Sequence, residues 1–205
     1  MSNYGLLLAM MEPTAGNSAE FQDWYDNEHI PERANITGFL NAERLVCTDG
    51  WPRYLALYDI ESADVLVGKE YSNIAFDNFS RWTKRMLPRV TGFYRRNLVQ
   101  IAPGRAAFAA AGAVAQVELL RFGGLDCDVS ETITSNLSKI EKIPGVRQVR
   151  LFETTDAGRR DHVLIIESAA LGATVVSQID ARMFGPAGEK LDLVNLYRPY
   201  WRTAQ

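Results

Sequence analysis

The chain has 205 residues, 47% of them hydrophobic and 23% charged, values typical of globular proteins that bury a sizeable core. The net charge of -3 is small and the 22 lysines and arginines are dispersed, which disfavours a nucleic-acid partner. No segment is long and apolar enough to span a bilayer, and the apolar run from Gly5 meets Glu12 too soon for a signal peptide. Cys47 and Cys127 lie far apart and have no metal-binding spacing, so we expect both to be reduced cysteines of a cytoplasmic protein. We expect no membrane partner.

Apolar runs and turn signals divide the first half into strand, helix, strand, strand, helix and strand. Asn17 precedes Glu20 by three residues, the spacing of a capping box. The first helix is expected to end before Pro31, because the residue that precedes a proline is pushed out of the α region. The predicted elements are strand 4–12, helix 17–29, strands 39–47 and 54–60, a helical region 63–86 broken at Gly68, and strand 90–101.

The second half is predicted to repeat this order after an alanine-rich stretch. Its elements are strand 114–121, helix 130–142, strands 145–154 and 162–168, helix 171–183 and strand 191–201. Three short sequence echoes recur in the same order in both halves: Ile36–Phe39 with Ile143–Val146, Asp59–Ser62 with Ile165–Ser168, and Phe93–Arg95 with Leu196–Arg198. The chain is therefore predicted to be a tandem duplication of a ferredoxin-like β-α-β-β-α-β unit.

The predicted class is α+β, with a first repeat over 1–102, a linker over 103–112 and a second, degenerate repeat over 113–205. Each unit has helices on one face of its sheet and needs cover for the other face. Two units in one chain can supply that cover by packing sheet to sheet as an intramolecular α/β barrel. We expect either a monomer with this internal pseudo-dimer or a homodimer.

The most informative stretch is FQDWYDNEHIPER, from Phe21 to Arg33, followed by Gly38 and Phe39 at a strand start. It resembles the signature of the EthD-like family of the dimeric α/β-barrel superfamily, over roughly residues 6–101. The second half lacks the motif. The superfamily includes lactone isomerases, cofactor-free monooxygenases, heme-handling enzymes, dehydratases and aldol-type lyases. The resemblance therefore implies the barrel and a small-molecule site, but not one reaction.

His29 is the leading candidate for catalysis. Tyr25 lies one helical turn before it, so the two side chains can approach each other. Histidine is the usual acid or base near neutral pH, and a helix C-terminus with Asp26 or Glu28 nearby would favour its protonated form. The alternative is that His29 only caps the last carbonyls of the helix.

Strand alternation supplies further candidates. Arg44, Tyr58, Tyr94 and Arg96 are assigned to the face where the two sheets meet, where they would bind an anionic or enolate oxygen. Each of them could instead be a surface charge or a rim tyrosine. Trp24 and Trp82 are candidates for substrate contact, with core packing as the alternative. The predicted catalytic residues are thus His29, Tyr25 and Arg44, and the predicted substrate-binding residues are Trp24, Tyr58, Trp82, Tyr94 and Arg96.

Two histidines are too few for a His-rich metal site, and no phosphate-binding glycine loop is present, so we expect no metal and no cofactor. The sequence predicts a cofactor-independent enzyme that acts on a small, mostly apolar, oxygenated substrate by His29-mediated proton transfer. Such a reaction would be an isomerisation, a dehydration or a lyase cleavage in a catabolic or secondary-metabolite pathway. The alternatives are a cofactor-free monooxygenase and a non-catalytic small-molecule-binding or stress-related barrel protein.

Overall fold

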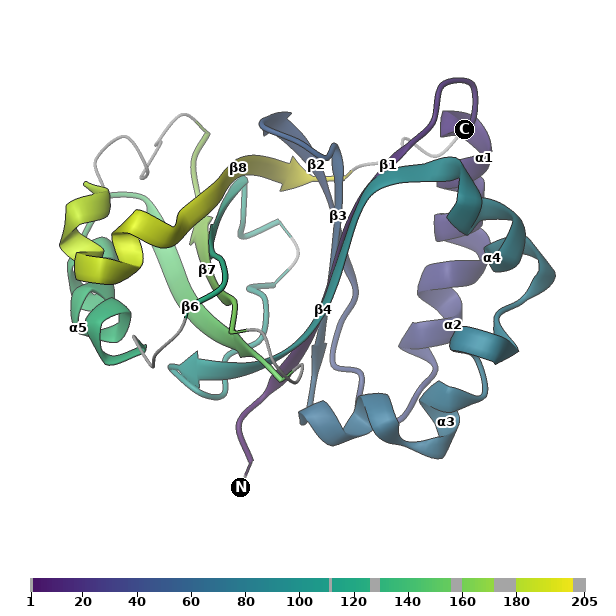
Figure 1. Cartoon of the computed structure of the whole chain (residues 1–205), viewed down its shortest axis with the longest axis horizontal. Coiled ribbons are helices and arrows are strands. Elements are labelled where there is room, and N and C mark those ends of the chain that lie inside the picture. Colours follow the sequence, from purple (N-terminus) through teal and green to yellow (C-terminus); the bar gives the residue numbers. More distant parts are fainter. Residues whose placement is uncertain (1, 111, 126–129, 156–159, 172–179, 201–205) are drawn as a thin grey trace.

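The computed structural model describes residues 2–110, 112–125, 130–155, 160–171 and 180–200, and its eight strands form one closed antiparallel barrel (Figure 1). The strands are β1 (Gly5–Pro13), β2 (Glu43–Asp49), β3 (Tyr54–Ile60), β4 (Val90–Ala102), β5 (Gln116–Phe122), β6 (Val146–Thr154), β7 (His162–Ser168) and β8 (Leu191–Pro199). Around the barrel their order is β1-β3-β2-β8-β5-β7-β6-β4.

The two halves of the chain contribute four neighbouring strands each. Both sheets have the same internal order, β4-β1-β3-β2 in the first half and β8-β5-β7-β6 in the second. They are joined at two seams, where β2 pairs with β8 and β4 pairs with β6. The α+β class and the barrel are thus confirmed, while the duplication and its boundaries remain predictions.

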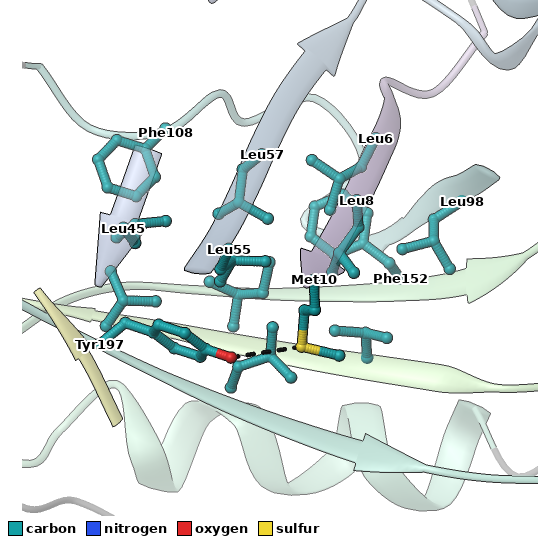
Figure 2. Packing of buried hydrophobic residues seen from close by; sticks show 14 of the residues in the cluster. Leu6, Leu8, Met10, Leu45, Leu55, Leu57, Leu98, Phe108, Phe152 and Tyr197 are labelled. Atoms are coloured by element: carbon teal, nitrogen blue, oxygen red, sulfur yellow. Dashed lines mark hydrogen bonds between the residues drawn. The ribbon is translucent and has the colours of Figure 1, made fainter. Parts of the chain in front are cut away.

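Alternation along the strands separates an inner layer from an outer layer. On β1, Leu6, Leu8 and Met10 pack into the barrel, while Leu7 and the residues that alternate with it face the helices. Figure 2 shows the inner cluster, to which both halves contribute. Its members include Leu45, Leu55, Leu57, Leu98, Phe152 and Tyr197. The middle of the barrel is therefore packed with side chains from both halves.

The segment predicted as a linker packs into the barrel rather than over it. Phe108 is buried in the inner cluster, and its backbone N–H donates to Asp59 on β3 at 2.7 Å. Arg150 on β6 pairs with Asp59 at 2.6 Å and with Glu167 on β7 at 2.8 Å, and the N–H of Ala109 donates to Glu167 at 2.9 Å. We call these five residues the Arg150 network, which joins the two halves through fully buried charges.

The first helix does not end before Pro31, contrary to the prediction. Helix α1 (Ser18–Trp24) continues through a π-helical turn, η1 (Tyr25–His29), into α2 (Ile30–Ala34). In this wider turn the N–H of Ile30 bonds to the carbonyl of Tyr25, five residues back. A proline in a regular α-helix clashes with the carbonyl four residues earlier, and we attribute the tolerance of Pro31 to the widened turn directly before it.

The second helical region of the first half is a series of short pieces rather than one helix. They are η2 (Ala63–Val67), α3 (Lys69–Ser72), η3 (Phe76–Asn78), α4 (Arg81–Met86) and η4 (Leu87–Arg89). Ser80 caps α4, because its hydroxyl accepts a hydrogen bond from the N–H of Thr83. Together with α1 and α2, these pieces cover the outer face of the first-half strands (Figure 1).

In the second half, α5 (Ser130–Ile140) and η6 (Ala181–Lys190) cover the outer face. The predicted helix 171–183 lies largely outside the described residues, as does Cys127. Strand β2 begins at Glu43 rather than at Phe39, which makes only an isolated bridge with Ile60. Among the described residues, no helix combines the length and the apolar character needed to cross a membrane.

Candidate functional site

A pocket of about 170 Å³ lies between the helices and the outer face of the first-half sheet. Its floor includes Ala9 on β1, whose strand neighbours in register are Ala56 on β3 and Arg95 on β4. Two adjacent alanines leave space beneath the helices that larger side chains would fill. The lining consists of Leu7, Ala9, Met11, His29, Arg33, Tyr58, Tyr71, Phe76, Phe79, Leu87, Phe93 and Arg95.

Aromatic side chains on α1 and η1 pack against the ring of His29. The ring centroid of Trp24 lies 4.1 Å from that of His29, and the ring of Tyr25 lies 5.0 Å from it in an edge-on arrangement. Trp24 is fully buried and its indole N–H donates to the hydroxyl of Thr83 at 3.0 Å. Trp24 does not line the pocket, and neither does Trp82, which packs against the edge of the outer cluster. Both tryptophans are thus placed as packing residues.

The imidazole of His29 has a defined tautomer. Its Nδ1 lies 3.0 Å from Nη1 of Arg33, which also donates to the backbone carbonyl of His29. A guanidinium can only donate, so Nδ1 must accept and the proton of the neutral ring must be on Nε2. Among the described residues nothing bonds to Nε2, and His29 lines the pocket. The ring is therefore a hydrogen-bond donor available to a ligand.

The expectation that His29 would be protonated is wrong. Burial, followed by the positive charges of Arg33, Arg44 and Arg95, holds the pKa of His29 well below its usual value. The two acids expected to pair with it are engaged elsewhere. Asp26 bonds to Arg44, and Glu28 accepts a hydrogen bond from the hydroxyl of Ser80. The helix does not end at His29 either, so its last carbonyls are not there to favour a cation.

Two tyrosines lie beside this ring. Tyr58 lines the pocket, and its buried hydroxyl makes no hydrogen bond of normal geometry, although it is close enough to Tyr25 to affect that residue's pKa. The hydroxyl of Tyr25 contacts Sδ of Met11 at 3.9 Å. Burial raises the pKa of Tyr25 to about 12 and that of Tyr58 well above its usual value. Both hydroxyls thus remain protonated, and Tyr58 is a second hydrogen-bond donor among the residues that line the pocket.

Two arginines make the pocket electropositive. Arg33 is buried beside His29, and Arg95 donates to the hydroxyl of Tyr71 at 2.9 Å. None of the described lining residues is an aspartate or a glutamate. Arg33, Arg95 and Tyr71 were not predicted from the sequence as site residues. Arg33 could have been predicted as a contact of His29, because it lies four residues later and thus on the same face of a helix.

Besides Trp24, Trp82 and Tyr25, three further sequence-predicted residues do not line this pocket. Arg44 is on the outer face of β2 but packs between the rings of Tyr25 and Tyr200, at 4.6 and 4.1 Å from their centroids, beside a different cleft of about 310 Å³. Tyr94 and Arg96 point into the barrel and both bond to Asp161. The assignment of Arg44, Tyr58, Tyr94 and Arg96 to one face is thus wrong, because this sheet is covered on both faces and both patterns look buried.

No family model matches the sequence, and no curated protein sequence matches it either. Similar solved structures exist. An anthrone oxidase-like protein aligns with a TM-score of 0.68 at 11% identity over 98% of this chain and 92% of its own. A putative monooxygenase from Lactobacillus acidophilus aligns with a TM-score of 0.56 at 8% identity over 97% and 94%. A heme-binding protein from Thermus thermophilus aligns with a TM-score of 0.58 at 9% identity over 97% and 92%.

These similar structures, together with the closed eight-stranded sheet, show a fold of the dimeric α/β-barrel type. At such low identities the likeness shows the fold alone. Membership of the EthD-like family remains a prediction.

One of the neighbours binds heme, and the first-half pocket does not fit that group. Its volume of about 170 Å³ is below the ~300 Å³ at which pockets for larger ligands begin. A histidine that binds a metal normally donates its other ring N–H to a carboxylate or a carbonyl, whereas Nδ1 of His29 faces the guanidinium of Arg33. Among the described residues, no group of three His, Cys, Asp or Glu side chains could hold a metal ion.

Proposed function

We propose that this protein is a cofactor-independent enzyme that binds a small, mostly apolar, oxygenated substrate in the first-half pocket as its enolate or phenolate. The observation that carries the proposal is the contact of Arg33 with Nδ1 of His29 at 3.0 Å. It directs Nε2–H of a neutral imidazole into a pocket lined by a second donor, Tyr58, and by no described carboxylate.

The chemistry that this arrangement supports is stabilisation of a negatively charged oxygen. Donors fixed in a site without bulk water stabilise developing charge more strongly than water does. His29 and Tyr58 would donate to the substrate oxygen, and Arg33 would supply positive charge behind the imidazole. The substrate's own acidity rises as a result, so the pocket favours binding of the substrate in its anionic form.

The pocket sets a size limit on the substrate. An engineered protein cavity of about 150 Å³ holds one benzene molecule. The volume of about 170 Å³ therefore suits one substituted ring inside the pocket, and any further part of a substrate would extend through the mouth. A heme or flavin beside the substrate would not fit, which supports a reaction carried by the substrate itself.

Oxygenation of the bound anion is the reaction that we favour. The isomerase, lyase or dehydratase reaction predicted from the sequence needs a group that takes up and returns a proton, and the lone pair of His29 is engaged by Arg33. An enolate or phenolate can instead pass electrons to dioxygen. In the simplest case a methylene becomes a carbonyl: one oxygen atom of O₂ enters the product and the other leaves with the two hydrogens as water. Two similar folds are named anthrone oxidase-like and putative monooxygenase.

The test is oxygen uptake by the purified protein with a panel of one-ring enolisable ketones and substituted phenols. We expect turnover in the wild type and a loss of about 10²–10³-fold in His29→Phe, because one oxyanion donor contributes that much in comparable sites. Trp82→Phe, which lies outside the pocket, is the matched control. Circular dichroism and thermal unfolding verify that each variant is folded.

Three outcomes would contradict the proposal. Undiminished turnover in a folded His29→Phe variant would remove the role of His29. Exchange of substrate C–H for deuterium without oxygen uptake would favour the isomerase or lyase reaction. Tight binding with neither process would favour a non-catalytic binding protein.

A further inference from the structure

The pocket has a buried end and an exposed end. His29 and Tyr58 are only 8% and 1% exposed, whereas Phe76 and Phe93 are 59% and 51% exposed. All four line the pocket, so the two phenylalanines mark its mouth. Arg95 lies two residues after Phe93 on the same face of β4 and is half-buried beside this mouth.

Arg95 has no acidic partner among the described residues. Its recorded contacts are the hydrogen bond to Tyr71 and the ring of Phe76, whose centroid is 5.6 Å from its guanidinium carbon. Other arginines of the first half do pair with carboxylates: Arg44, Arg53, Arg85, Arg89 and Arg96. Arg95 is thus a positive charge directed along the wall of a pocket that contains no described acid.

Phe76 adds a second, independent observation. It is the one described non-glycine residue with a positive φ, at 55°, a conformation that costs free energy for a bulky side chain. Strained backbone persists where the surrounding structure requires it, often beside a ligand site. Here the strain places an exposed ring at the pocket mouth against the guanidinium of Arg95, which restricts the orientation of that group.

We infer that the substrate is a one-ring organic acid that carries a carboxylate in addition to its enolic or phenolic oxygen, and that Arg95 binds this carboxylate at the mouth. The inference rests on the proposed function, since it assumes that the oxygen meets His29 and Tyr58 at the buried end. Arg95 then acts as a residue that determines specificity. It selects acids over neutral analogues and fixes which end of the ring enters first.

Calorimetric titration with a matched pair of probes, 4-hydroxyphenylacetate and its methyl ester, tests the inference. We expect the acid to bind at least about tenfold more tightly than the ester, as for a hydrogen bond to a charged group, and its affinity to fall with added salt. Arg95→Met should abolish this preference and Arg95→Lys should retain part of it. Arg85→Met, an exposed arginine outside the pocket, is the control and should retain all of it.

Ala9→Leu tests whether the probes bind in the first-half pocket. The larger side chain fills the pocket floor and should remove binding of both probes. Equal affinity for acid and ester, or a preference that survives Arg95→Met, would overturn the inference and leave the proposed function standing. Failure of both probes to bind, or binding that survives Ala9→Leu, would also overturn it. Failure of the proposed function is a separate result, namely oxygen uptake that is absent or independent of His29.

Discussion

The two halves of the barrel have the same strand order, but the layers outside their sheets differ in what they contain. In the first half, this layer contains His29, Arg33 and Tyr58 around a pocket. In the described part of the second half, it contains a cluster of aliphatic and aromatic side chains: Leu120, Phe122, Ile133, Leu137, Val149, Leu151, Leu164, Ile166 and Phe184. The difference shows that the same strand order can support a pocket under the helices of one half and a packed apolar cluster in the described part of the other.

The comparison assumes that the two halves unfold together. Breaking the Arg150 network tests this assumption and should give the largest loss of stability of the variants considered. Arg150→Met leaves Asp59 and Glu167 buried without their counter-charge, which should lower the free energy of unfolding by about 3–5 kcal/mol. Denaturant unfolding measures it. In Arg121→Met, which breaks a partly exposed pair with Asp192, the loss should stay below about 1 kcal/mol. Similar losses in the two variants would mean that the network does not hold the halves together.

Matched overpacking substitutions compare the two outer layers directly. Ala187→Leu inserts a larger side chain into the fully buried second-half cluster and should destabilise the protein by about 1–3 kcal/mol. Ala9→Leu extends into the first-half pocket and should cost much less, while it abolishes ligand binding. Thermal unfolding of both variants measures the contrast. If Ala9→Leu is the more costly change, the pocket is not open space in solution.

Acidification should affect the first half through His29. The pKa of His29 is lowered in the folded state, so below pH 6.5 the unfolded chain binds the proton first. The free energy of unfolding should therefore fall as pH falls, by up to about 1.4 kcal/mol per pH unit. His29→Asn should remove this part of the slope between pH 7 and 5.5. An unchanged slope in the variant would assign the acid sensitivity to other groups.

The smallest expected effect on stability comes from removing the hydroxyl of Tyr58. The hydroxyl of Tyr58 has no good hydrogen bond, so Tyr58→Phe should change the free energy of unfolding by less than about 0.5 kcal/mol while it weakens turnover. The hydroxyl of Tyr197, in the barrel interior, accepts a hydrogen bond from Asn195 at 2.7 Å. Tyr197→Phe should cost about 1–2 kcal/mol. A large loss of stability in Tyr58→Phe would mean that its hydroxyl is structural.

Much of the barrel was predictable because strand patterns are local. The strands 54–60 and 162–168 were predicted with their observed bounds, and the others lie within two residues of theirs, except that β2 begins four residues later than predicted. Which face of each strand turns inward was not predictable, since helices cover the outer face and the opposite sheet covers the inner face. Apolar residues therefore alternate with other apolar residues. This ambiguity assigned Tyr58 to the same face as Tyr94, although they point in opposite directions.

The site was only partly predictable for a related reason. The motif singled out His29 and Tyr25, because an aromatic helix that leads to a histidine is visible in sequence. The pKa of His29 is lowered first by burial and then by Arg33, Arg44 and Arg95, and two of these arginines come from strands β2 and β4. The rule that a proline ends a helix also hid Arg33, which continues the same helix beyond Pro31.

The π-helical turn has a consequence for how such chains should be aligned. Each residue of an α-helix advances the side-chain direction by about 100°. A π-helical turn holds one surplus residue, so it absorbs an inserted residue without turning the residues after it, whereas the same insertion in a regular α-helix would rotate them by about 100°. His29 and Arg33 thus lie on the face that Phe21 and Trp24 occupy, and the ring of His29 packs against that of Trp24 five residues earlier. A relative one residue shorter here would present the same helix face to the pocket with regular α-helical winding, so an alignment of such chains needs a one-residue gap at this turn.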